Sequence, residues 1–302
     1  MSKLDNTEIS KVLGQRVDAP KQYDRSILVR EKRANNREYL NIKDDNLPFI
    51  GIDIWNNWEI SALTDTGLPV TGIAKITYPC SSKYIVESKS AKLYFNSFNM
   101  SRFGKTPADV IKNIENTSSK DLSDFLETDV VVKIFTAAKH PSTDCDVFFK
   151  TFKNIDLINS KLVTETYNET PSLLKTINTE DNIGVAINQR YCSSLLRSNC
   201  RVTNQPDAGD VYISVTTKHN IDPESLLKYI ISFRNECHFH EEICECFYAR
   251  LKEVYEAEEL FVGCFYVRRG SLDINPVRAS SESMIPQFLK TPETPFFKMP
   301  RQ

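Results

Sequence analysis

LPVTGIAKI at residues 68–76 and QPDAGDVYI at residues 205–213 align with a proline and a glycine at matching positions. KLYFNSFN at residues 92–99 aligns in the same way with LKYIISFR at residues 227–234, and these two segments share a tyrosine, a serine and a phenylalanine. In both comparisons the second segment follows the first by about 136 residues. Two matches in the same order and at similar spacing indicate an internal duplication. The sequence therefore predicts two related modules.

The first module shows strand patterns followed by a helix and a further strand. Residues 68–78 have a strand pattern, and residues 84–98 continue it. Thr106 and Pro107 are a typical helix start, because the hydroxyl caps the first turn and proline suits the first helical position. We expect this helix to run through DVIKNIEN and to give way to a strand at residues 129–137.

The second module repeats this arrangement. CRVT (200–203) and DVYISVTT (210–217) read as strands joined by the turn-forming NQPDAG. One helix is expected from Asp222–Pro223 onward, and a second over residues 240–255, where apolar residues recur at helical spacing. Residues 260–269 close the unit as a strand. Each module then has two strands, two helices and two strands, which is an α+β class with helices over one sheet face.

These patterns divide the chain into five segments. The residues before the first module are polar, with runs of charge, and read as a flexible arm or a wrapping segment. The residues between the modules look irregular. The expected segments are the arm (1–47), the first module (48–140), a connector (141–179), the second module (180–276) and a tail (277–302).

The composition is typical of a soluble globular protein, with 40% hydrophobic and 26% charged residues. The formal net charge of −2 gives no basic field that would attract a nucleic acid. The first residues lack the apolar core of a secretory signal, and the apolar stretches are too short to span a membrane. We therefore expect a cytoplasmic protein that binds neither nucleic acid nor membrane, and whose eight cysteines stay reduced.

Cys200 lies in RSNCRVTNQPDAG, next to Arg201. A nearby guanidinium favours the thiolate, which is the nucleophilic form of cysteine. Asp207 would lie roughly 23 Å away along an extended chain. A reversal at residues 204–206 can bring it back beside the sulfur, where a buried carboxylic acid can donate a proton. For these residues alone, an interior cysteine beside a turn aspartate is the commoner meaning.

Two further pairs are candidates for ligand binding. Glu87 and Lys89 lie in VESKSAK, and a buried glutamate suits a guanine-like edge because one carboxylate accepts two N–H bonds. A solvated charge cluster is the commoner meaning of such a segment. His240 and Glu241 fall in the first turn of an expected helix, where they can hold a ligand or simply favour the helix.

Metal and nucleotide motifs are weak in this sequence. CHFHEEICEC fits neither HExxH nor paired CxxC spacing, so we expect no metal site. The nine glycines include no GxG spacing and therefore no Rossmann fingerprint. Arg268, Arg269 and Gly270 can clamp a phosphate, although a basic turn is the commoner meaning.

Four segments, ESKSAKLYFNSFN, SNCRVTNQPDAG, SFRNECHFHE and RRGSLDINPVR, resemble the NADPH-dependent 7-cyano-7-deazaguanine reductases of queuosine biosynthesis. NLPFIGIDIWNNWE extends the match into the first module. The resemblance runs from about Asn46 to Pro276 and follows the longer, two-module form of the family. Four motifs in the same order make it specific, and they favour the functional meaning of each segment over the commoner one.

The resemblance implies a tunnelling fold, in which tandem ββααββ modules form antiparallel sheets that assemble around a barrel. It also implies reduction of a nitrile to an aminomethyl group with NADPH, by a homodimer. The first module keeps ESKS but has Leu63 near the position that corresponds to Cys200. The second keeps the cysteine and the His-Glu pair but has no ESKS. One complete site therefore needs both modules, and we expect one site per chain.

The resemblance further implies a role for each candidate residue. Cys200 would attack the nitrile carbon to form a covalent thioimide, and Asp207 would donate the proton. The residues implied to hold the deazaguanine are Val86, Glu87, Ser88, His240 and Glu241. Those implied to contact NADPH are Ser88, Lys89, Arg269 and Gly270.

Three other functions compete with this one. Nitrile hydrolysis also begins with cysteine attack, but needs a base that delivers water. A zinc cyclohydrolase-like member of the same fold would contain bound metal. A purine-binding module without turnover would bind the base tightly whether or not Cys200 is present.

Overall fold

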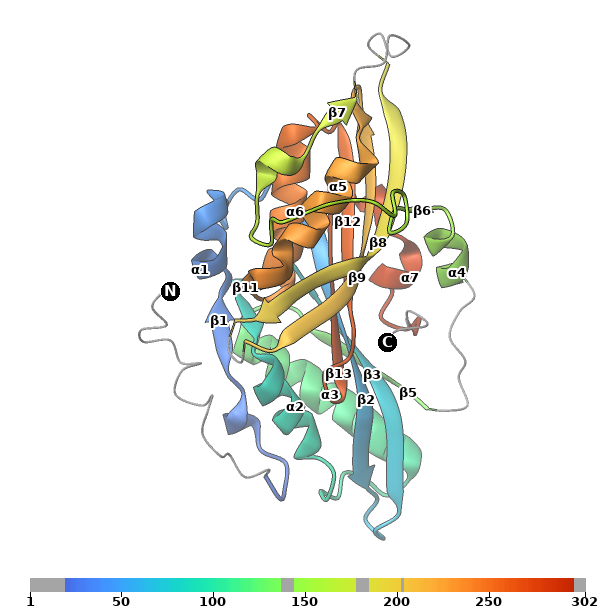
Figure 1. Ribbon diagram of the computed structural model, residues 1–302. Helices are drawn as coiled ribbons and strands as arrows, with labels where there is room; N and C mark the ends of the chain where they lie inside the picture. Colours follow the sequence, from blue (N-terminus) through green and yellow to red (C-terminus); the bar gives the residue numbers. More distant parts are fainter. Residues whose placement is uncertain (1–19, 137–143, 178–184, 202–203, 296–302) are drawn as a thin grey trace.

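The computed structural model describes residues 20–136, 144–177, 185–201 and 204–295, so parts of the expected arm, connector and tail lie outside the described residues. One long sheet runs through the molecule, with helices on both of its faces (Figure 1). Its strand order is β11-β8-β9-β12-β13-β2-β3-β5, and β6 also pairs with β8. The long strands all pair antiparallel, whereas the two-residue strands β6 and β11 run parallel to β8. The α+β class expected from the sequence is confirmed.

The first half of the chain contains two long strands, two helices and two shorter strands. The elements are β2 (Ile50–Leu63), β3 (Pro69–Pro79), β4 (Tyr84–Val86), α2 (Ser88–Asn96), α3 (Pro107–Leu126) and β5 (Val131–Phe135). Thr106 and Asp109 form the capping box at the start of α3, with Pro107 in the first turn. The strand expected over residues 84–98 is wrong beyond Val86, because Glu87 caps helix α2 there.

The second half has the same order of elements and one more long strand. They are β8 (Ile187–Cys200), β9 (Pro206–Thr217), β10 (Asn220–Ile221), α5 (Pro223–Ile231), β11 (Cys237–His238), α6 (His240–Val254), β12 (Glu259–Tyr266) and β13 (Leu272–Ala279). The strand expected to start at Cys200 is wrong, since β8 precedes this position and ends there, and residues 202–203 lie outside the described residues. The next strand begins at Pro206, four residues earlier than the sequence pattern indicated.

The two halves match in detail. Strands β2 and β8 are both 14 residues long, and they end at Leu63 and Cys200, the two positions matched by sequence. Both strands contain an irregularity in their pairing with the following strand, and helices α2 and α5 are both nine residues long. Among the described residues, β5 is the only sheet strand that follows α2 and α3 in the first half, whereas β12 and β13 both follow α6.

Three apolar cores hold the layers together. One packs α5 and α6 against β8, β9 and β12, and another packs α2 and α3 against β2, β3 and β5. Side chains alternate along each strand, so every second residue points to the opposite face of the sheet. The third core lies on that face and includes Phe261, Phe265 and Val277. Helices α4 (Asp144–Phe149) and α7 (Gln287–Lys290) lie on that face (Figure 1).

The segments outside the two halves are attached to them. Strand β1 (Arg30–Lys32) pairs with β4 and leads into helix α1 (Arg33–Arg37), so residues 30–37 are ordered parts of the fold. Strands β6 (Lys153–Asn154) and β7 (Thr176–Ile177) pair with β8 and β10. The Nζ of buried Lys75 on β3 donates to three carbonyls of the tail, those of Phe288, Thr291 and Thr294. Within the described ranges, no helix combines the length and apolar character needed to cross a bilayer.

Candidate active site

A cavity of about 390 Å³ lies where the two halves meet, and its walls include all ten candidate residues. Helix α2 and strand β4 of the first half form one wall, whereas β8, β9 and α6 of the second half form the other. The ten residues that the sequence analysis selected are Val86, Glu87, Ser88, Lys89, Cys200, Asp207, His240, Glu241, Arg269 and Gly270. Neither half alone contains this set.

The hairpin between β8 and β9 brings Asp207 back toward Cys200. Asp207 pairs with Ser198, which lies two residues before Cys200, so the separation along the strand falls to about 7 Å. Because side chains alternate, Ser198, Cys200 and Asp207 lie on the same sheet face. The turn is closed by a hydrogen bond from the backbone N of Cys200 to the carbonyl of Gln205, at 2.8 Å. The reversal expected at residues 204–206 is therefore present.

Asp207 is 4% exposed and lies between two groups that can carry positive charge. Nε2 of His240 is 3.3 Å from its Oδ2, and Nη1 of Arg269 is 3.0 Å from its Oδ1. This second contact is an ion pair by distance only, since Oδ1 accepts no hydrogen bond of good geometry. The His240 ring stacks on the buried ring of Tyr266, with the centroids 3.7 Å apart. Asp207 and His240 are thus held together at the cavity wall.

Glu241 is a buried carboxylate in the first turn of α6, with 3% of its surface exposed. Its Oε1 has no hydrogen-bond partner among the described residues. Burial raises the pKa of Glu241, and the charge of Asp53 raises it further, whereas Arg33 and His240 oppose both effects. An unpaired buried acceptor costs free energy, and a ligand that donates N–H bonds to it removes that cost.

The Glu87 carboxylate binds backbone N–H groups of the helix that follows it, which the sequence analysis did not predict. Its Oε1 accepts from the backbone N of Lys89 at 2.8 Å, and its Oε2 from the backbone N of Ser90 at 2.7 Å. The side chain therefore caps helix α2 and fixes the start of the ESKS segment. Each carboxylate oxygen keeps a second lone pair, so the cap and a ligand contact are compatible.

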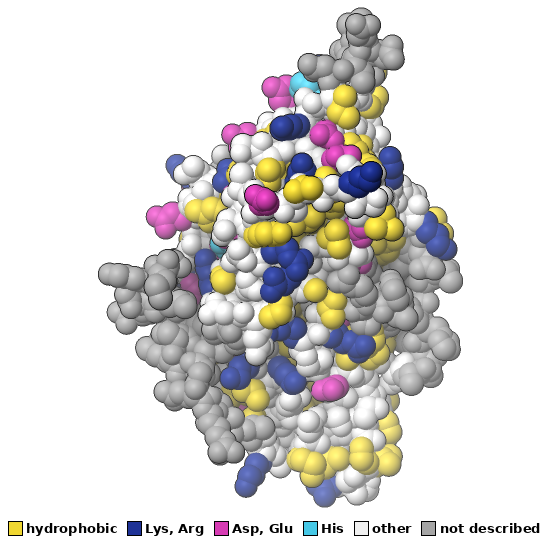
Figure 2. Space-filling model, viewed as in Figure 1, with side chains coloured by type: hydrophobic (Ala, Val, Ile, Leu, Met, Phe, Trp, Pro, Cys, Tyr) yellow, Lys and Arg dark blue, Asp and Glu magenta, His cyan; other side chains and the backbone are white. Residues whose placement is uncertain are grey.

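Basic groups surround the opening of the cavity. Lys89 and Lys92 project from α2, three residues apart and hence on neighbouring positions of one helix face. Gly270 has a left-handed backbone with φ of +65°, and a Cβ at this position would lie 2.4 Å from Nζ of Lys92. Figure 2 shows Lys and Arg side chains gathered over the central part of this face of the molecule. This basic rim suits phosphate groups, so the residues present fit a dinucleotide cofactor.

Some lining residues were missed by sequence reasoning. They are Trp55, Lys92, Gln205, His238, Phe239, Val267, Leu272 and Ile274. For Lys92 the available signal was its spacing from Lys89, whereas the apolar residues read as ordinary core. The guanidinium of Arg201, expected beside the sulfur, is held by Oδ1 of Asn36 and by Oε1 of Glu242.

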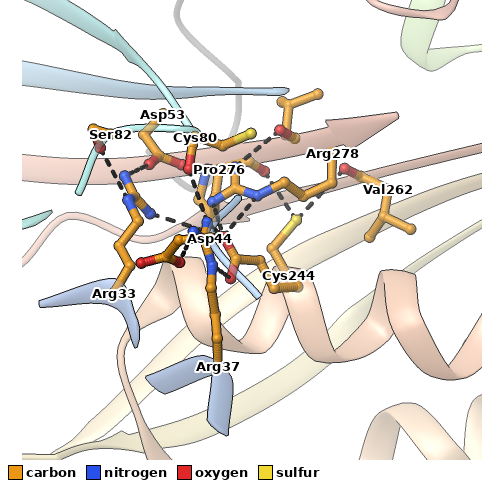
Figure 3. A network of polar contacts seen from close by, with 12 residues as sticks. Arg33, Arg37, Asp44, Asp53, Cys80, Ser82, Cys244, Val262, Pro276 and Arg278 are labelled. Atoms are coloured by element: carbon orange, nitrogen blue, oxygen red, sulfur yellow. Dashed lines mark hydrogen bonds and ion pairs between the residues drawn. The ribbon is translucent and has the colours of Figure 1, made fainter. Parts of the chain in front are cut away.

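Figure 3 shows a network of buried charges, and two of its members, Asp53 and Arg33, act electrostatically on Glu241. Arg33 and Arg278 bind opposite oxygens of Asp53, and both guanidiniums also contact Glu245. Arg37 joins the network through Glu245 at 2.7 Å and through Asp44 at 2.7 Å. These residues come from helix α1, strands β2 and β13 and helix α6, except for Asp44, which lies in the turn between α1 and β2. The network therefore connects the N-terminal segment with both halves.

The fold and the cavity place this chain in a class of α+β proteins in which two matching halves share one site. Two family models match it: one described as "Nitrile reductase, 7-cyano-7-deazaguanine-reductase N-term" over residues 19–134, and one described as "QueF-like protein" over residues 206–284. A protein of Colwellia psychrerythraea named NADPH-dependent 7-cyano-7-deazaguanine reductase is 39% identical over 93% of this chain and 95% of its own length.

Proteins with the same name from Legionella pneumophila and Psychrobacter cryohalolentis are 37% and 35% identical, over 89% and 91% of this chain and 89% and 95% of their own lengths. The chain belongs to the family of NADPH-dependent 7-cyano-7-deazaguanine reductases. A crystal structure titled as the archaeosine synthase QueF-Like in the apo form is 15% identical, with a TM-score of 0.28, over 32% of this chain and 94% of that one.

Proposed function

We propose that this protein reduces the nitrile of 7-cyano-7-deazaguanine to an aminomethyl group with NADPH, as a cytoplasmic step of queuosine biosynthesis. The observation that carries the proposal is the single cavity lined by Cys200, Asp207, His240 and Glu241 together with the ESKS segment. The names of the relatives, which cover nearly the whole chain, support the same substrate and cofactor.

In the proposed reaction the Cys200 sulfur attacks the nitrile carbon. A C–S bond forms, one π bond of the nitrile breaks, and the nitrogen takes a proton, which gives a covalent thioimide. Asp207 donates this proton, and its contact with His240 provides a route by which it is replaced. When bound, NADPH would supply hydride, and two hydrides with two protons convert one nitrile to one amine, the second proton reaching the nitrogen by the same Asp207 route. The thiolate of Cys200 leaves between the two reductions and is free for the next turnover.

The deazaguanine is held by groups on both walls of the cavity. Glu241 accepts N–H bonds from the base, which gives its unpaired Oε1 a partner. His240 and Glu87 flank it from α6 and from the start of α2, and Val86 and Ser88 provide neighbouring contacts. Ser88, Lys89, Arg269 and Gly270 contact NADPH, and Lys92 adds a third cation to this rim.

The same proposal extends to the architecture. Residues 48–140 and 180–276 act as two tunnelling-fold modules, and two chains pair as a homodimer whose sheets assemble around a barrel. The matched strand ends at Leu63 and Cys200 support the tandem modules. Light scattering tests the pairing, because a dimer has twice the 34.6 kDa mass of the chain.

Intact-protein mass spectrometry with 7-cyano-7-deazaguanine tests the chemistry. Wild type should gain the mass of the substrate, and NADPH should clear this adduct with formation of the aminomethyl product. Cys200→Ala should show no adduct. Cys237→Ser is the matched control, since Cys237 lies on the adjacent strand and does not line the cavity. It should behave as wild type.

Other outcomes identify the competing functions. An adduct that water clears without NADPH, giving an amide or acid, would mean nitrile hydrolysis. Tight base binding by both wild type and Cys200→Ala, without adduct or NADPH consumption, would mean a binding module. Bound zinc would favour the cyclohydrolase-like alternative; the described residues contain no cluster of metal-ligating side chains.

A further inference from the structure

Glu242 follows the His240-Glu241 pair directly, but it does not line the cavity. Its side chain is 1% exposed and makes three polar contacts. Oε1 lies 2.9 Å from Nδ1 of His238 and 3.4 Å from Nη2 of Arg201, and Oε2 accepts from the backbone N of Phe239. The carboxylate thus contacts two basic side chains and also caps helix α6.

Both basic partners of Glu242 are backbone neighbours of Cys200, one in the sequence and one across a strand pair. Arg201 is the next residue, and its guanidinium also binds Asn36 of helix α1 and lies over the ring of Phe239. His238 pairs with Cys200 where β11 runs parallel to β8. This pairing is only two residues long, so the backbone joins β8 to β11 weakly on that side, whereas on its other side β8 pairs with β9 as far as Asn199. The carboxylate of Glu242 connects that strand end to the first turn of α6.

His238 extends these contacts into a row of alternating charges. Its Nε2 is 3.0 Å from Oε2 of Glu236. Burial lowers the pKa of His238, but the hydrogen bond to Glu236 and the close carboxylate of Glu242, an ion pair by distance, outweigh burial and raise this pKa to about 9. The ring is therefore charged at neutral pH, and the row reads Arg201, Glu242, His238 and Glu236 with alternating sign. The ring of Tyr39 stacks on the His238 ring, with the centroids 5.6 Å apart.

We propose that Glu242 is a positioning residue that holds the Cys200 end of β8 against the first turn of α6. This inference rests on the proposed function, since it concerns the reach of the Cys200 sulfur toward a base held by His240 and Glu241. Without the carboxylate, Arg201 and His238 lose the group that joins both of them to the first turn of α6, so the strand end is held less tightly against the helix. A shift of the sulfur by about 1 Å can lower the rate of attack by up to a hundredfold.

The test separates binding of the base from attack on the nitrile. Glu242→Gln keeps an oxygen that can cap Phe239 but removes the charge. We expect its single-turnover rate of adduct formation, at saturating 7-cyano-7-deazaguanine, to fall by about tenfold to a hundredfold. The affinity for the nitrile-free base 7-deazaguanine should stay within about threefold of wild type, because His240 and Glu241 are unchanged. Glu253→Gln on the same helix, whose carboxylate is 75% exposed, is the matched control and should leave both quantities at wild-type values.

Three outcomes are distinguishable. Adduct formation by Glu242→Gln at the wild-type rate overturns the inference. If Glu242→Gln loses base affinity and adduct rate in parallel, Glu242→Asp, which keeps the charge, decides between positioning and damage to the fold. Recovery of more of the adduct rate than of the base affinity supports positioning. Equal recovery of both, or recovery of neither, indicates general damage to the fold and overturns the inference. Absence of an adduct in wild type instead refutes the proposed covalent reaction itself.

Discussion

Substitution of Asp53 by Asn should strongly destabilise the protein, because the carboxylate lies at the centre of the buried charge network (Figure 3). Asp53 is fully buried, and its two oxygens bind the equally buried guanidiniums of Arg33 and Arg278. In the network three guanidiniums face three carboxylates, those of Asp53, Glu245 and Asp44. A neutral amide in place of the Asp53 carboxylate would leave one positive charge in the interior without compensation.

The expected loss follows from the cost of an unpaired buried charge. Removal of one partner of a buried ion pair costs about 3–5 kcal/mol of unfolding free energy, and here two pairs share the lost carboxylate. The loss should depend on pH. Burial raises the pKa of Asp53, but Arg278 and Arg33 outweigh burial and hold it below the usual range. The contribution is therefore complete above the unfolded pKa of about 4 and is lost as pH falls through the folded pKa.

Urea denaturation followed by circular dichroism measures this loss at pH 7 and at several values down to about pH 2, so that the series extends below the unfolded pKa of about 4. Asp124→Asn is the control, because the Lys120–Asp124 pair has a similar 2.7 Å contact but lies at the surface, and it should cause no measurable change. A loss below about 1 kcal/mol for Asp53→Asn at pH 7, or a gap from wild type that widens as the pH falls toward about 4, would refute the reasoning.

Three further predictions concern Glu241, Lys75 and Gly270. Glu241→Gln should add about 1 kcal/mol to the unfolding free energy of the ligand-free protein at pH 7, since it removes a buried charge, yet it should weaken base binding at least about tenfold. Because burial raises the pKa of Glu241, the stability added by Glu241→Gln should disappear below about pH 4. Denaturation measures the unfolding free energy and calorimetry measures the affinity for the base. An unchanged affinity for the base would contradict the role assigned to Glu241. Lys75→Met should cost about 3 kcal/mol and raise hydrogen exchange in residues 287–294, whereas Lys120→Met, at a 72% exposed position on α3, is the control and should do neither. Normal protection of the tail in Lys75→Met would show that Lys75 does not anchor it. Gly270→Ala should raise the KM for NADPH by displacing the Lys92 ammonium. Gly67 has a similar positive φ but lies away from the cavity, so Gly67→Ala is the control and should leave this KM unchanged. Equal effects of both substitutions would point to backbone strain alone.

The sequence carried most of the information about which residues meet. Pro69 and Gly72 align with Pro206 and Gly209, and the same alignment matches Leu63 with Cys200. In the structure these two matched residues are the last residues of β2 and β8. The turn residues before Asp207 predicted a reversal, and the observed register brings Asp207 level with Ser198. These signals are local, or repeat along the chain, and can therefore be read without a structure.

Contacts between distant segments could not be predicted in this way. Glu87 looked like a ligand group or a solvated charge, because nothing in VESKSAK shows that the chain turns into a helix at Ser88. Arg201 was expected beside the sulfur, but its partners Asn36 and Glu242 lie 165 and 41 residues away. The three-arginine network likewise depends on tertiary contacts between helix α1 and strand β13, which have no periodic pattern.

The duplication bears on the proposal that each chain has one site, which needs both halves. Where β8 meets β11, Cys200 pairs in parallel with His238, and at the matching place in the first half Leu63 makes a parallel bridge with Arg102. The backbone of the first half therefore repeats the support around Cys200, but it presents an aliphatic side chain there, so this half has no nucleophile. Its contribution lies elsewhere, in the capped start of α2, where Glu87, Ser88 and Lys89 complete a cavity whose other wall is the second half. Each half thus supplies one wall of the cavity. A mutation that only separates the two halves should abolish binding of the base, although every residue that lines the cavity would be unchanged.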